Sequence, residues 1–437
     1  MKYFVFIMAA VCVPPFAFLL SLNRHWVKYA FVGILLAMCI YLRTSINFFS
    51  HEDYRGSARG MEVSLAHLMA FALIGAMIFA RKFRSWMPDL GYGFYLVYFL
   101  LCLPSLSAAE DRLIAWFEVW KMILLYFFYI AVFNYLKLTD DLHTVIGSLA
   151  VFAIINMLYV VYLHFCGVYQ PHGVFPHQNS MAVAMQLLGP IFFAAYMMFG
   201  LRSLFSMLCS FAFVCAAMAT LRSYSRMAMM LVPFNYGLVF LLCAIIGRPR
   251  YWWLRILPIV AMGLLVLVAM LPRIIERYQK APEASANTRV ELALCAWEMI
   301  KDEPWRGVGI NNWGIKINLP YEYAERAGRM PNRREGYADG IVETVYLLVC
   351  AECGIPALLA MLAWFGWYLF KSLTLMIRLR GTESFFVPAG CLAGFVSIYV
   401  QSVFEWVLRQ QLNLICLMFV FAILSYLNDK RLLSTTK

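Results

Sequence analysis

Apolar runs long enough to cross a lipid bilayer recur along almost the whole chain. A helix rises about 1.5 Å per residue, so a hydrocarbon core of about 30 Å requires roughly 20 apolar residues. The runs are continuous rather than alternating in polarity, which excludes a membrane β-barrel. We therefore expect an all-α polytopic membrane helical bundle of about 12–13 transmembrane helices. Their approximate cores are 3–21, 26–42, 61–80, 90–108, 113–136, 142–166, 180–200, 203–221, 226–247, 252–271, 341–372, 384–408 and 410–427.

Charged residues are few and stand mostly between these runs. They make up 14% of the chain, whereas soluble domains have about a quarter. The net charge of +12 comes from short basic clusters rather than from one large patch, so we expect no nucleic-acid partner. By the positive-inside rule, clusters near residues 81–84, 248–250, 371–380 and 430–431 face the cytoplasm. The intervening loops, above all 272–340, are then expected outside.

The longest polar segment carries its own helix signal. Thr288, followed by Glu291, forms a capping-box pattern that predicts an amphipathic helix over 288–303. The helix is expected to lie on the membrane surface or to pack on the bundle. Its predicted apolar face consists of Val290, Leu294, Trp297 and Ile300. The chain then divides into N-terminal spans at 1–271, a large outward loop at 272–340, and C-terminal spans with a short cytoplasmic tail at 341–437.

Nothing in the sequence predicts a metal or another cofactor. Nearly all of the 12 cysteines lie inside apolar runs, where a thiol behaves as a small hydrophobe, so we expect no disulfide framework. Cys350 and Cys353 form a single CxxC without a second pair, which is a weak metal or redox signal. No Walker motif is present, so ATP-driven transport by this chain alone is not expected.

A polar loop precedes the run that begins near residue 180. It contains His172, His177 and Asn179 in the stretch YQPHGVFPHQNS. One interpretation is a polar turn in which Asn179 or Ser180 caps the following helix. The other is a loop that contacts a sugar or phosphate at a helix N-terminus, where free N–H groups favour anions. Two histidines five residues apart make no metal site by themselves.

Three arginines stand at the expected outer boundary of the membrane. Arg222 and Arg226 lie four residues apart in LRSYSRMAMM, which we interpret as one helical face. Both can reach outer headgroups, or they can bind a diphosphate, because a guanidinium matches phosphate oxygens in a bidentate manner. Arg289 is expected in the first turn of the amphipathic helix, where its charge opposes the helix dipole and favours a partner anion.

Two carboxylates lie within the apolar stretch GIVETVYLLVCAECGIP. Glu343 stands at the expected outer mouth of the span and Glu352 lies deeper, just before Gly354 and Pro356. The nine-residue separation places the two on opposite sides of a helix, so they cannot form one acid–base pair. Glu352 and Gly354 are interpreted as structural, with Glu352 bonding backbone groups freed by a kink or pairing with an arginine. Glu343 is interpreted as a base at a wet mouth.

Together these stretches resemble the O-antigen ligase and O-antigen polymerase superfamily of bacterial integral-membrane glycosyltransferases. GVFPHQN resembles G-x-F-x-x-P/H-N, and SYSRMA resembles the helix start S-R-G/A. NTRVELALCAWEMIKDEPWRGVGINNW resembles R-x-x-x-x-x-x-A-x-x-M-I-x-x-x-P-x-x-G-x-G. ETVYLLVCAECGIPALL resembles H-N-x-Y-L-x-x-x-x-E-x-G-x-x-G. The resemblance covers roughly residues 170–360 and implies a GT-C-like bundle.

One departure from the family pattern concerns the site. Glu343 stands where ligases of this family carry a histidine regarded as catalytic, and Thr344 stands where they carry asparagine. Either Glu343 serves as the base, or His172 or His177 replaces it. The remaining alternatives are that this member acts on a different acceptor or is inactive.

The resemblance implies a metal-independent, inverting transfer of a glycan from a polyprenyl (undecaprenyl) diphosphate carrier to an acceptor hydroxyl. The acceptor is a lipid, glycan or protein, and the site faces the outside of the bacterial inner membrane. Glu343, Arg226 and Arg289 are the expected catalytic residues. The expected substrate-binding residues are Arg222, His172, His177, Asn179 and Asn312.

Ligase and polymerase both fit this pattern, and two other classes remain open. A transporter or flippase for an anionic amphipathic substrate would place charges near the bilayer midplane in two similar halves, and no such symmetry is visible in the sequence. A non-catalytic scaffold in an envelope-polysaccharide assembly is left open by the missing histidine.

Overall fold

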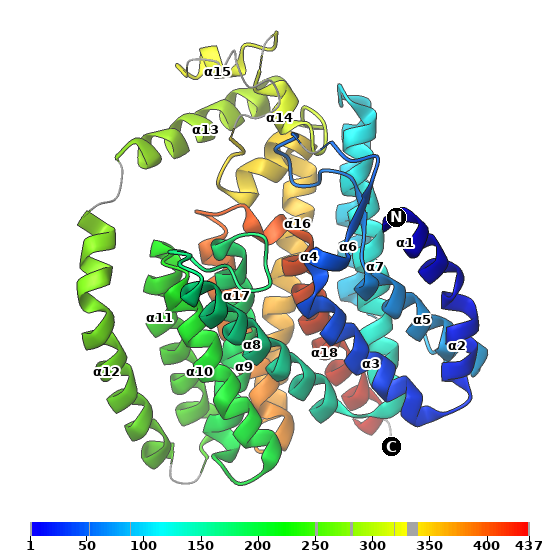
Figure 1. The fold of residues 1–437 in the computed structure, drawn as a ribbon, viewed down its shortest axis with the longest axis vertical. Helices are drawn as coiled ribbons and strands as arrows, with labels where there is room; N and C mark the ends of the chain where they lie inside the picture. The colour runs from blue at the N-terminus through cyan, green and yellow to red at the C-terminus, as the bar shows by residue number, and fades with distance from the viewer. Residues whose placement is uncertain are drawn as a thin grey trace. The chain divides into compact units, whose positions relative to one another are not determined.

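The computed structural model describes residues 2–51, 53–87, 89–249, 252–279, 283–318, 320–329 and 340–435. Side chains are described for these residues apart from residue 2 and positions within 258–286 and 430–435. Residues 330–339 of the predicted outward loop therefore lie outside the described part. The predicted all-α polytopic membrane bundle is confirmed (Figure 1). Among the described residues, ten helices are long and apolar enough to cross a membrane.

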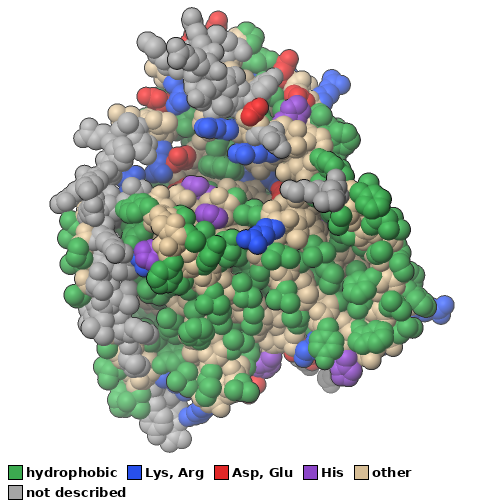
Figure 2. All heavy atoms as spheres, viewed as in Figure 1, with side chains coloured by type: hydrophobic (Ala, Val, Ile, Leu, Met, Phe, Trp, Pro, Cys, Tyr) green, Lys and Arg blue, Asp and Glu red, His purple; other side chains and the backbone are tan. Residues whose placement is uncertain are grey.

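All thirteen predicted apolar runs are helical over most of their length. The runs that are not among the ten long helices correspond to α3 (Arg24–Cys39), α5 (Leu65–Phe79) and α12 (Trp252–Gln279). The first run is divided into two helices, because α1 (Lys2–Val11) ends just before α2 (Val13–Ser21), which has proline in its first turn. Hydrophobic side chains dominate the face drawn in Figure 2, as expected of a surface in contact with lipid.

The chain forms two compact units assembled from interleaved segments. The first unit contains residues 1–142, 287–368 and 402–437, and the second contains residues 143–286 and 369–401. These units do not follow the sequence-based division at residues 271 and 341. The sequence-based division describes which residues lie in the membrane and which lie in the loop 272–340, and it stays a prediction.

In the first unit, α7 (Arg112–Thr139) is the central helix. It packs against α5 and against α18 (Gln411–Thr435), while α5 also contacts α2 and α3. The unit also contains α1, α4 (Tyr41–Thr44), α6 (Leu90–Cys102), η1 (Leu103–Ser107), most of α13 (Glu283–Asp302), α14 (Trp313–Lys316), α15 (Tyr323–Arg326), most of α16 (Val345–Arg378), η5 (Val407–Arg409) and a small sheet.

One small sheet is present among the described residues. Strand β1 (Ile46–Phe48) pairs antiparallel with β2 (Met61–Val63), in a register that places Ile46 opposite Val63 and Phe48 opposite Met61. The two strands close the loop 49–60, and this loop carries Tyr54 and Ser57 into the interior of the first unit.

In the second unit, α9 (Gln178–Phe199) is buried along most of its length. It packs against α10 (Leu204–Arg222), α11 (Arg226–Leu242) and α17 (Phe386–Gln401). The unit also contains α8 (Leu142–Phe165), the π-helical turn η2 (Cys243–Gly247), α12 and η4 (Glu383–Phe385). An almost fully buried α9 explains its continuous apolar sequence, because no side of the helix faces water.

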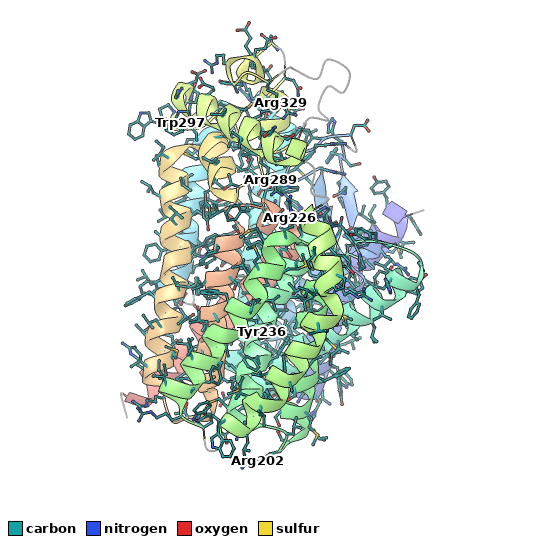
Figure 3. The ribbon with its side chains drawn as sticks, turned by 90° about the vertical axis from the view of Figure 1, so that its left-hand side faces the viewer. Arg202, Arg226, Tyr236, Arg289, Trp297 and Arg329 are labelled. Atoms are coloured by element: carbon teal, nitrogen blue, oxygen red, sulfur yellow. The ribbon has the colours of Figure 1, made fainter. Side chains whose placement is uncertain are left out.

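Helix α13 differs from its sequence prediction at both its start and its apolar face. It begins at Glu283, so Thr288 lies inside the helix rather than at its N-cap. The buried face consists of Leu292, Cys295, Ala296, Met299 and Ile300. Of the four residues predicted for that face, only Ile300 is buried, and Val290, Leu294 and Trp297 are exposed. Figure 3 shows Trp297 at the outer side of the helix. Helical spacing alone could not separate two apolar stripes on one helix.

Candidate functional site

The loop that follows α13 docks on a break in α16. At Gly354 the backbone leaves the helical conformation, with φ 83° and ψ 170°. Nearby, the Val308 N–H donates to the carbonyl of Ala351 over 2.9 Å and the Gly309 N–H donates to that of Glu352 over 3.1 Å. The Ile355 N–H in turn donates to the carbonyl of Pro304 over 2.8 Å. The loop thus satisfies backbone groups that the break leaves without helical partners.

Glycine is required on both sides of this contact. A Cβ added to Gly307, whose φ is +70°, would lie 2.3 Å from the carbonyl carbon of Glu352. A Cβ added to Gly354 would lie 2.4 Å from the carbonyl oxygen of Trp305. Neither position tolerates a side chain, because two backbones meet there and both residues adopt a left-handed or related conformation. The glycines of the WRGVG and AECGIP stretches therefore have one shared structural cause.

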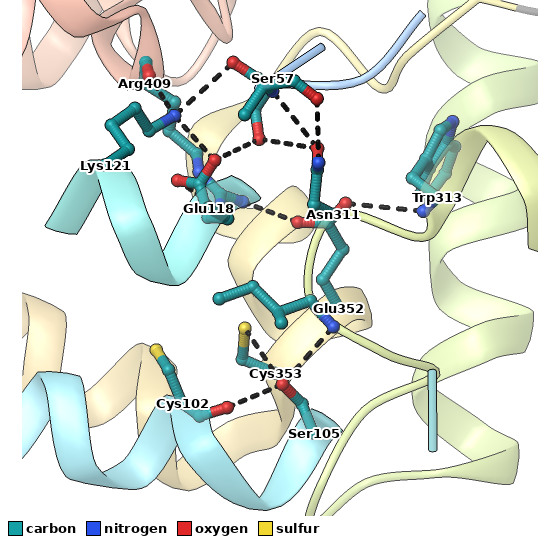
Figure 4. Close-up of polar contacts among 12 residues, drawn as sticks. Ser57, Cys102, Ser105, Glu118, Lys121, Asn311, Trp313, Glu352, Cys353 and Arg409 are labelled. Carbon is teal, nitrogen blue, oxygen red and sulfur yellow. Dashed lines mark hydrogen bonds and ion pairs between the residues drawn. The ribbon is translucent and has the colours of Figure 1, made fainter. Parts of the chain in front are cut away.

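Four charged side chains form a buried cluster beside this break (Figure 4). Arg409 lies 2.6 Å from Glu352 and 2.9 Å from Glu118, and Lys121 lies 2.6 Å from Glu118. The side chains of all four are at most 5% exposed. Two carboxylates and two cations make the cluster electrically neutral. Burial of an unpaired charge would cost several kcal/mol, so this pairing is what makes the charges tolerable inside the unit.

Hydrogen bonds add internal links to the cluster and extend it to two further segments, the 49–60 loop and α14. The Ser57 hydroxyl donates to Glu118 over 2.7 Å, and the Lys121 ammonium donates to the backbone carbonyl of Arg409 over 2.9 Å. The Trp313 N–H lies 3.4 Å from the Glu352 carboxylate. The cluster therefore connects the 49–60 loop, α7, α14, α16 and η5. Sequence reasoning expected Glu352 to bond backbone groups or an arginine, and the structure gives it one contact of each kind.

Asn311 and Asn312 direct their amide groups into the protein. The Asn311 amide donates to the carbonyls of Ala58 and Ile114, each over 2.8 Å. Asn312 accepts from the N–H of Asp111 over 2.9 Å and donates to its carbonyl over 3.1 Å. Both asparagines are fully buried. This gives Asn312 a role in holding the loop, and its predicted contact with substrate stays a prediction.

The cavity next to the cluster is small. It has a volume of about 30 Å³ and is lined by Glu118, Arg409, Tyr95, Tyr98 and Trp364 among others. Such a space holds one or two waters, whereas ligand pockets measure roughly 300–1,000 Å³. We therefore assign the cluster to the architecture of the first unit rather than to substrate binding.

A second group of charges is partly open to solvent. Arg289 on α13 forms a hydrogen-bonded ion pair through Nε with Glu343, which precedes α16. Its Nη2 lies 3.9 Å from Glu405, in the turn between α17 and α18. The side chains of Arg289 and Glu343 are 34% and 36% exposed, and that of Glu405 is 8% exposed. Because α13 begins at Glu283, Arg289 does not stand in its first turn, and the predicted conflict with the helix dipole is wrong. Its partner anions are the two carboxylates.

In the second unit, the polar loop before α9 supplies the N-cap of that helix, but the capping residue differs from the one predicted. His177 is the N-cap, and its Nδ1 accepts the N–H of Asn179 over 3.2 Å, so neither Asn179 nor Ser180 has this role. Burial, and secondarily the nearby charge of His172, lowers the pKa of His177. The Nδ1 of His172 lies 2.5 Å from the carbonyl of Phe175. Both rings are therefore held in place by local contacts.

Arg222 and Arg226, the two arginines of the second unit that were predicted at the outer boundary, belong to different helices. Arg222 is the last residue of α10 and Arg226 is the first of α11, so the interpretation that they share one helical face is wrong. Between them, Tyr224 has a φ of 52°, which turns the chain sharply. The Arg222 guanidinium donates to the Tyr224 hydroxyl over 3.2 Å. Figure 3 shows Arg226 at one end of α11 and Tyr236 farther along it.

The structure thus groups the predicted site residues by unit. Arg289 meets Glu343, and Glu352 stands beside Gly354, all in the first unit. Arg222, Arg226, His172, His177 and Asn179 belong to the second unit. Among the described residues, no three His, Cys, Asp or Glu side chains gather closely enough to hold a metal ion.

Sequence reasoning missed Glu118, Lys121, Glu405 and Arg409. A signal was present for the first two, because a carboxylate and an ammonium three residues apart inside the apolar run 113–136 are costly unless they are paired. Arg409 carried a similar signal between the last two runs. Its partners, however, lie 57 and 291 positions away, and no spacing rule connects residues so far apart.

A family comparison covers the segment that contains Arg222, Arg226, Arg289 and Glu343. Residues 211–362 match the model of a protein family described as O-Antigen ligase. This segment is similar to members of the O-antigen ligase family. The sequence-based resemblance to the O-antigen ligase and polymerase superfamily is thereby confirmed. No curated protein matches the chain. The O-antigen ligase segment begins in α10 and ends in α16, so it includes Arg222, Arg226, Arg289 and Glu343.

The family and the fold together indicate the broad class of the protein. Ten apolar helices and an O-antigen ligase segment are features of a multi-pass bacterial membrane protein. The family also indicates a membrane enzyme of the glycosyltransferase type. The turn that carries Glu405 and Arg409 lies outside the O-antigen ligase segment, although it contacts residues within that segment.

Proposed function

We propose that this protein transfers a glycan from a polyprenyl diphosphate carrier to an acceptor hydroxyl on the outer face of the bacterial inner membrane. The observation that carries the proposal is the partly exposed Glu343, held by Arg289 within the O-antigen ligase segment. A carboxylate that is fixed by a neighbour and still reachable from solvent meets the first requirement of a general base.

The proposed step is an inverting displacement. The acceptor oxygen forms a bond to the anomeric carbon of the glycan, and the bond between that carbon and the diphosphate oxygen breaks. The electron pair leaves with the diphosphate, and the proton of the acceptor hydroxyl passes to Glu343. A positioned base contributes about 10²–10⁴ in rate, which is the size of effect that loss of Glu343 should produce.

We assign the diphosphate to Arg222 and Arg226. Arg222 and Arg226 flank the sharp turn at Tyr224, and Arg222 is oriented by the Tyr224 hydroxyl. Guanidinium groups match phosphate oxygens and stabilise the charge that develops as the diphosphate leaves, so no metal ion is required for this role. We assign substrate contact to His172, His177 and Asn179, which lie on the polar loop before α9 and in the first turn of that helix.

The proposal covers two outcomes that differ only in the acceptor. A ligase transfers the glycan to a lipid or protein, and a polymerase transfers it to another glycan. In both cases the partners are the lipid-linked donor, the acceptor and membrane lipids. The identity of the covalent product decides between the two outcomes.

The test is glycan transfer in cells that lack the protein and are complemented with variants. These are the wild type, Glu343→Gln, Glu343→His and Arg226→Ala, with the amount of each protein in the membrane measured. We expect Glu343→Gln to lower transfer by about 10²-fold or more, because the amide cannot accept the proton. Glu343→His should retain part of the activity, because imidazole is also a base.

A matched control and a contrary result complete this test. Glu298 forms an exposed ion pair with Lys301 on the same helix as Arg289, so Glu298→Gln removes a comparable carboxylate away from the site. It should leave transfer unchanged. If Glu343→Gln is silent while Arg226→Ala is inactive, the base lies elsewhere, and His172 and His177 become the next residues to replace. Absence of transfer by the wild type from any lipid-linked donor would contradict the proposed function itself.

A further inference from the structure

We infer that Glu405 is a positioning residue of the transfer site, one that orients Arg289 and through it the base Glu343. The inference rests on the proposed function for its catalytic consequence. Glu405 lies outside the segment that matches the O-antigen ligase family, and its role follows from contacts on three different elements of the first unit.

The exposed fractions give the two carboxylates different roles. Arg289 stands between them, with Nε paired to Glu343 and Nη2 lying 3.9 Å from Glu405. Glu343 is 36% exposed and can meet an acceptor, whereas Glu405 is 8% exposed and cannot. This is the arrangement of a base with an orienting partner behind it, as in catalytic triads where a third group fixes the base.

The turn that carries Glu405 is held rigidly at both ends. At its start, the Val345 N–H donates to the carbonyl of Ser402 over 3.1 Å, which ties the turn to the beginning of α16. At its end, Arg409 joins the buried cluster through Glu118 and Glu352. A carboxylate on such a turn has little freedom, so it can fix the direction of a long arginine side chain that would otherwise be mobile.

The charges explain why Arg289 acts on the base rather than on the donor. Arg289 faces a carboxylate on either side, and neither carboxylate attracts a diphosphate. Each of the two ion pairs also keeps part of the guanidinium occupied. Arg289 therefore holds Glu343 in position rather than binding the diphosphate.

A purely structural ion pair would give a different experimental result. Glu405 is nearly buried, so if it served only to stabilise the fold, Glu405→Gln would lower the unfolding temperature and the amount of folded protein. Loss of orientation instead lowers the rate, because a base displaced by about 1 Å can lose about 10²-fold in activity. The effect should fall on kcat rather than on KM.

The experiment combines a double-mutant cycle with a chemical probe of Arg289. Transfer is measured for the wild type, Glu405→Gln, Glu405→Asp, Arg289→Ala and the double variant Glu405→Gln/Arg289→Ala. We expect Glu405→Gln to lower kcat about 10-fold or more and Glu405→Asp to retain more activity. The double variant should be no worse than Arg289→Ala alone, because Glu405 acts through Arg289. Activity of Glu405→Gln within twofold of the wild type, or full additivity in the double variant, would overturn the inference.

The second readout does not depend on transfer. In purified protein, the rate at which phenylglyoxal modifies Arg289 is followed by mass spectrometry, with Arg306, an exposed arginine paired to Glu303, as the internal reference. Glu405→Gln should raise the modification rate of Arg289 several-fold and leave that of Arg306 unchanged. An unchanged rate at Arg289 would refute the positioning role. If the rate rises as expected and the wild type still transfers no glycan, the proposed function fails while Glu405 keeps its contact role.

Discussion

Arg409 shows how a single side chain can hold together parts of the chain that are far apart in sequence. It is 4% exposed and pairs with one carboxylate from α7 and another from α16. A guanidinium suits this position because its planar fork presents several N–H donors in fixed directions. With Lys121 as the second cation, the cluster contains equal numbers of positive and negative groups, and loss of any one member leaves a net charge in the interior.

The first prediction concerns that balance. Replacement of Arg409 by Gln leaves two buried carboxylates with one lysine, and we expect a loss of about 3–5 kcal/mol, as when one partner of a buried ion pair is removed. The double variant Arg409→Gln/Glu352→Gln should recover much of this loss, because the Glu118–Lys121 pair that remains is neutral. The measurement is thermal unfolding in detergent. The control is the double variant Arg409→Gln/Glu298→Gln, which should be no more stable than Arg409→Gln alone. If Glu352→Gln and Glu298→Gln restored the same stability to Arg409→Gln, the charge argument would be contradicted.

The second prediction concerns the contact between Gly307 and the break in α16. Gly307→Ala places a methyl group where the backbone of Glu352 lies and strains a residue with φ +70°, so we expect a loss of at least about 1–3 kcal/mol. Gly366→Ala is the matched control, because nothing lies within 4 Å of its added Cβ and the residue is helical. That control should be neutral or slightly stabilising, since alanine favours a helix by about 0.5–1 kcal/mol over glycine. Equal unfolding temperatures for the two variants would contradict the close approach.

At the scale of elements, the ends of helices carry much of the polar organisation. The N-cap of α9 is a histidine, α10 and α11 meet at a left-handed tyrosine, and α16 breaks at a glycine that receives a loop. In each case the interior of the helix is apolar and the functional candidates lie at its end. This follows from the unpaired N–H and C=O groups of helix termini, which attract polar side chains and ligands.

The third prediction is a pH dependence that belongs to the end of α9. The pKa of His177 lies below its usual value of about 6.5, so the unfolded chain takes up a proton more readily than the folded protein. The stabilising contribution of the neutral ring is therefore present above pH 6.5 and is lost as the pH falls through the lowered pKa. Protonation of Nδ1 also removes the acceptor that caps the helix, a loss of about 0.5–2 kcal/mol.

The test compares the wild type with His177→Asn, which caps a helix without titrating. Unfolding temperatures are measured between about pH 7.5 and about pH 5, on either side of the ordinary histidine pKa. The wild type should lose more stability on acidification than the asparagine variant. Parallel curves for the two proteins would show that His177 does not contribute to the pH dependence.

At the scale of the whole molecule, each of the two units draws on separate parts of the sequence. The first unit needs residues from the beginning, the later middle and the end of the chain. The O-antigen ligase segment contributes helices to both units. Within the first unit, its Arg289 contacts Glu405, which lies in a turn outside the segment. We therefore expect the matched segment alone to be insufficient for a folded site.

The fourth prediction concerns the side of the membrane on which the loops lie. The positive-inside rule places residues 272–340 outside and the cluster near 248–250 in the cytoplasm. In a variant with the exposed Cys12 and Cys166 replaced by serine, Glu325→Cys should react with a membrane-impermeant maleimide in cells whose outer membrane is permeabilised. Arg248→Cys should react only after the inner membrane is opened. The reverse pattern would invert the topology and would place Glu343 on the wrong side for the proposed transfer.

The sequence predicted some features of this molecule well because their cause is local. Continuous apolar runs identified the helices, and the spacing of motifs identified the family. The failures have a common origin in tertiary contacts. Thr288 has the pattern of an N-cap, but the helix continues to Glu283, and the partners of Arg409 are too distant in sequence for a pattern to reveal. Likewise, α13 carries two apolar stripes, and the sequence does not show which of them packs against the rest of the first unit.

The buried cluster also sets an order for biogenesis. When α7 enters the membrane, Glu118 and Lys121 neutralise each other within one turn of the same helix. Glu352 then arrives with α16 and has no cation until Arg409 is synthesised, more than fifty residues later. During that interval a partly inserted chain carries an uncompensated carboxylate at the break in α16. The buried charges of the first unit are therefore balanced only when the turn between α17 and α18 has been made.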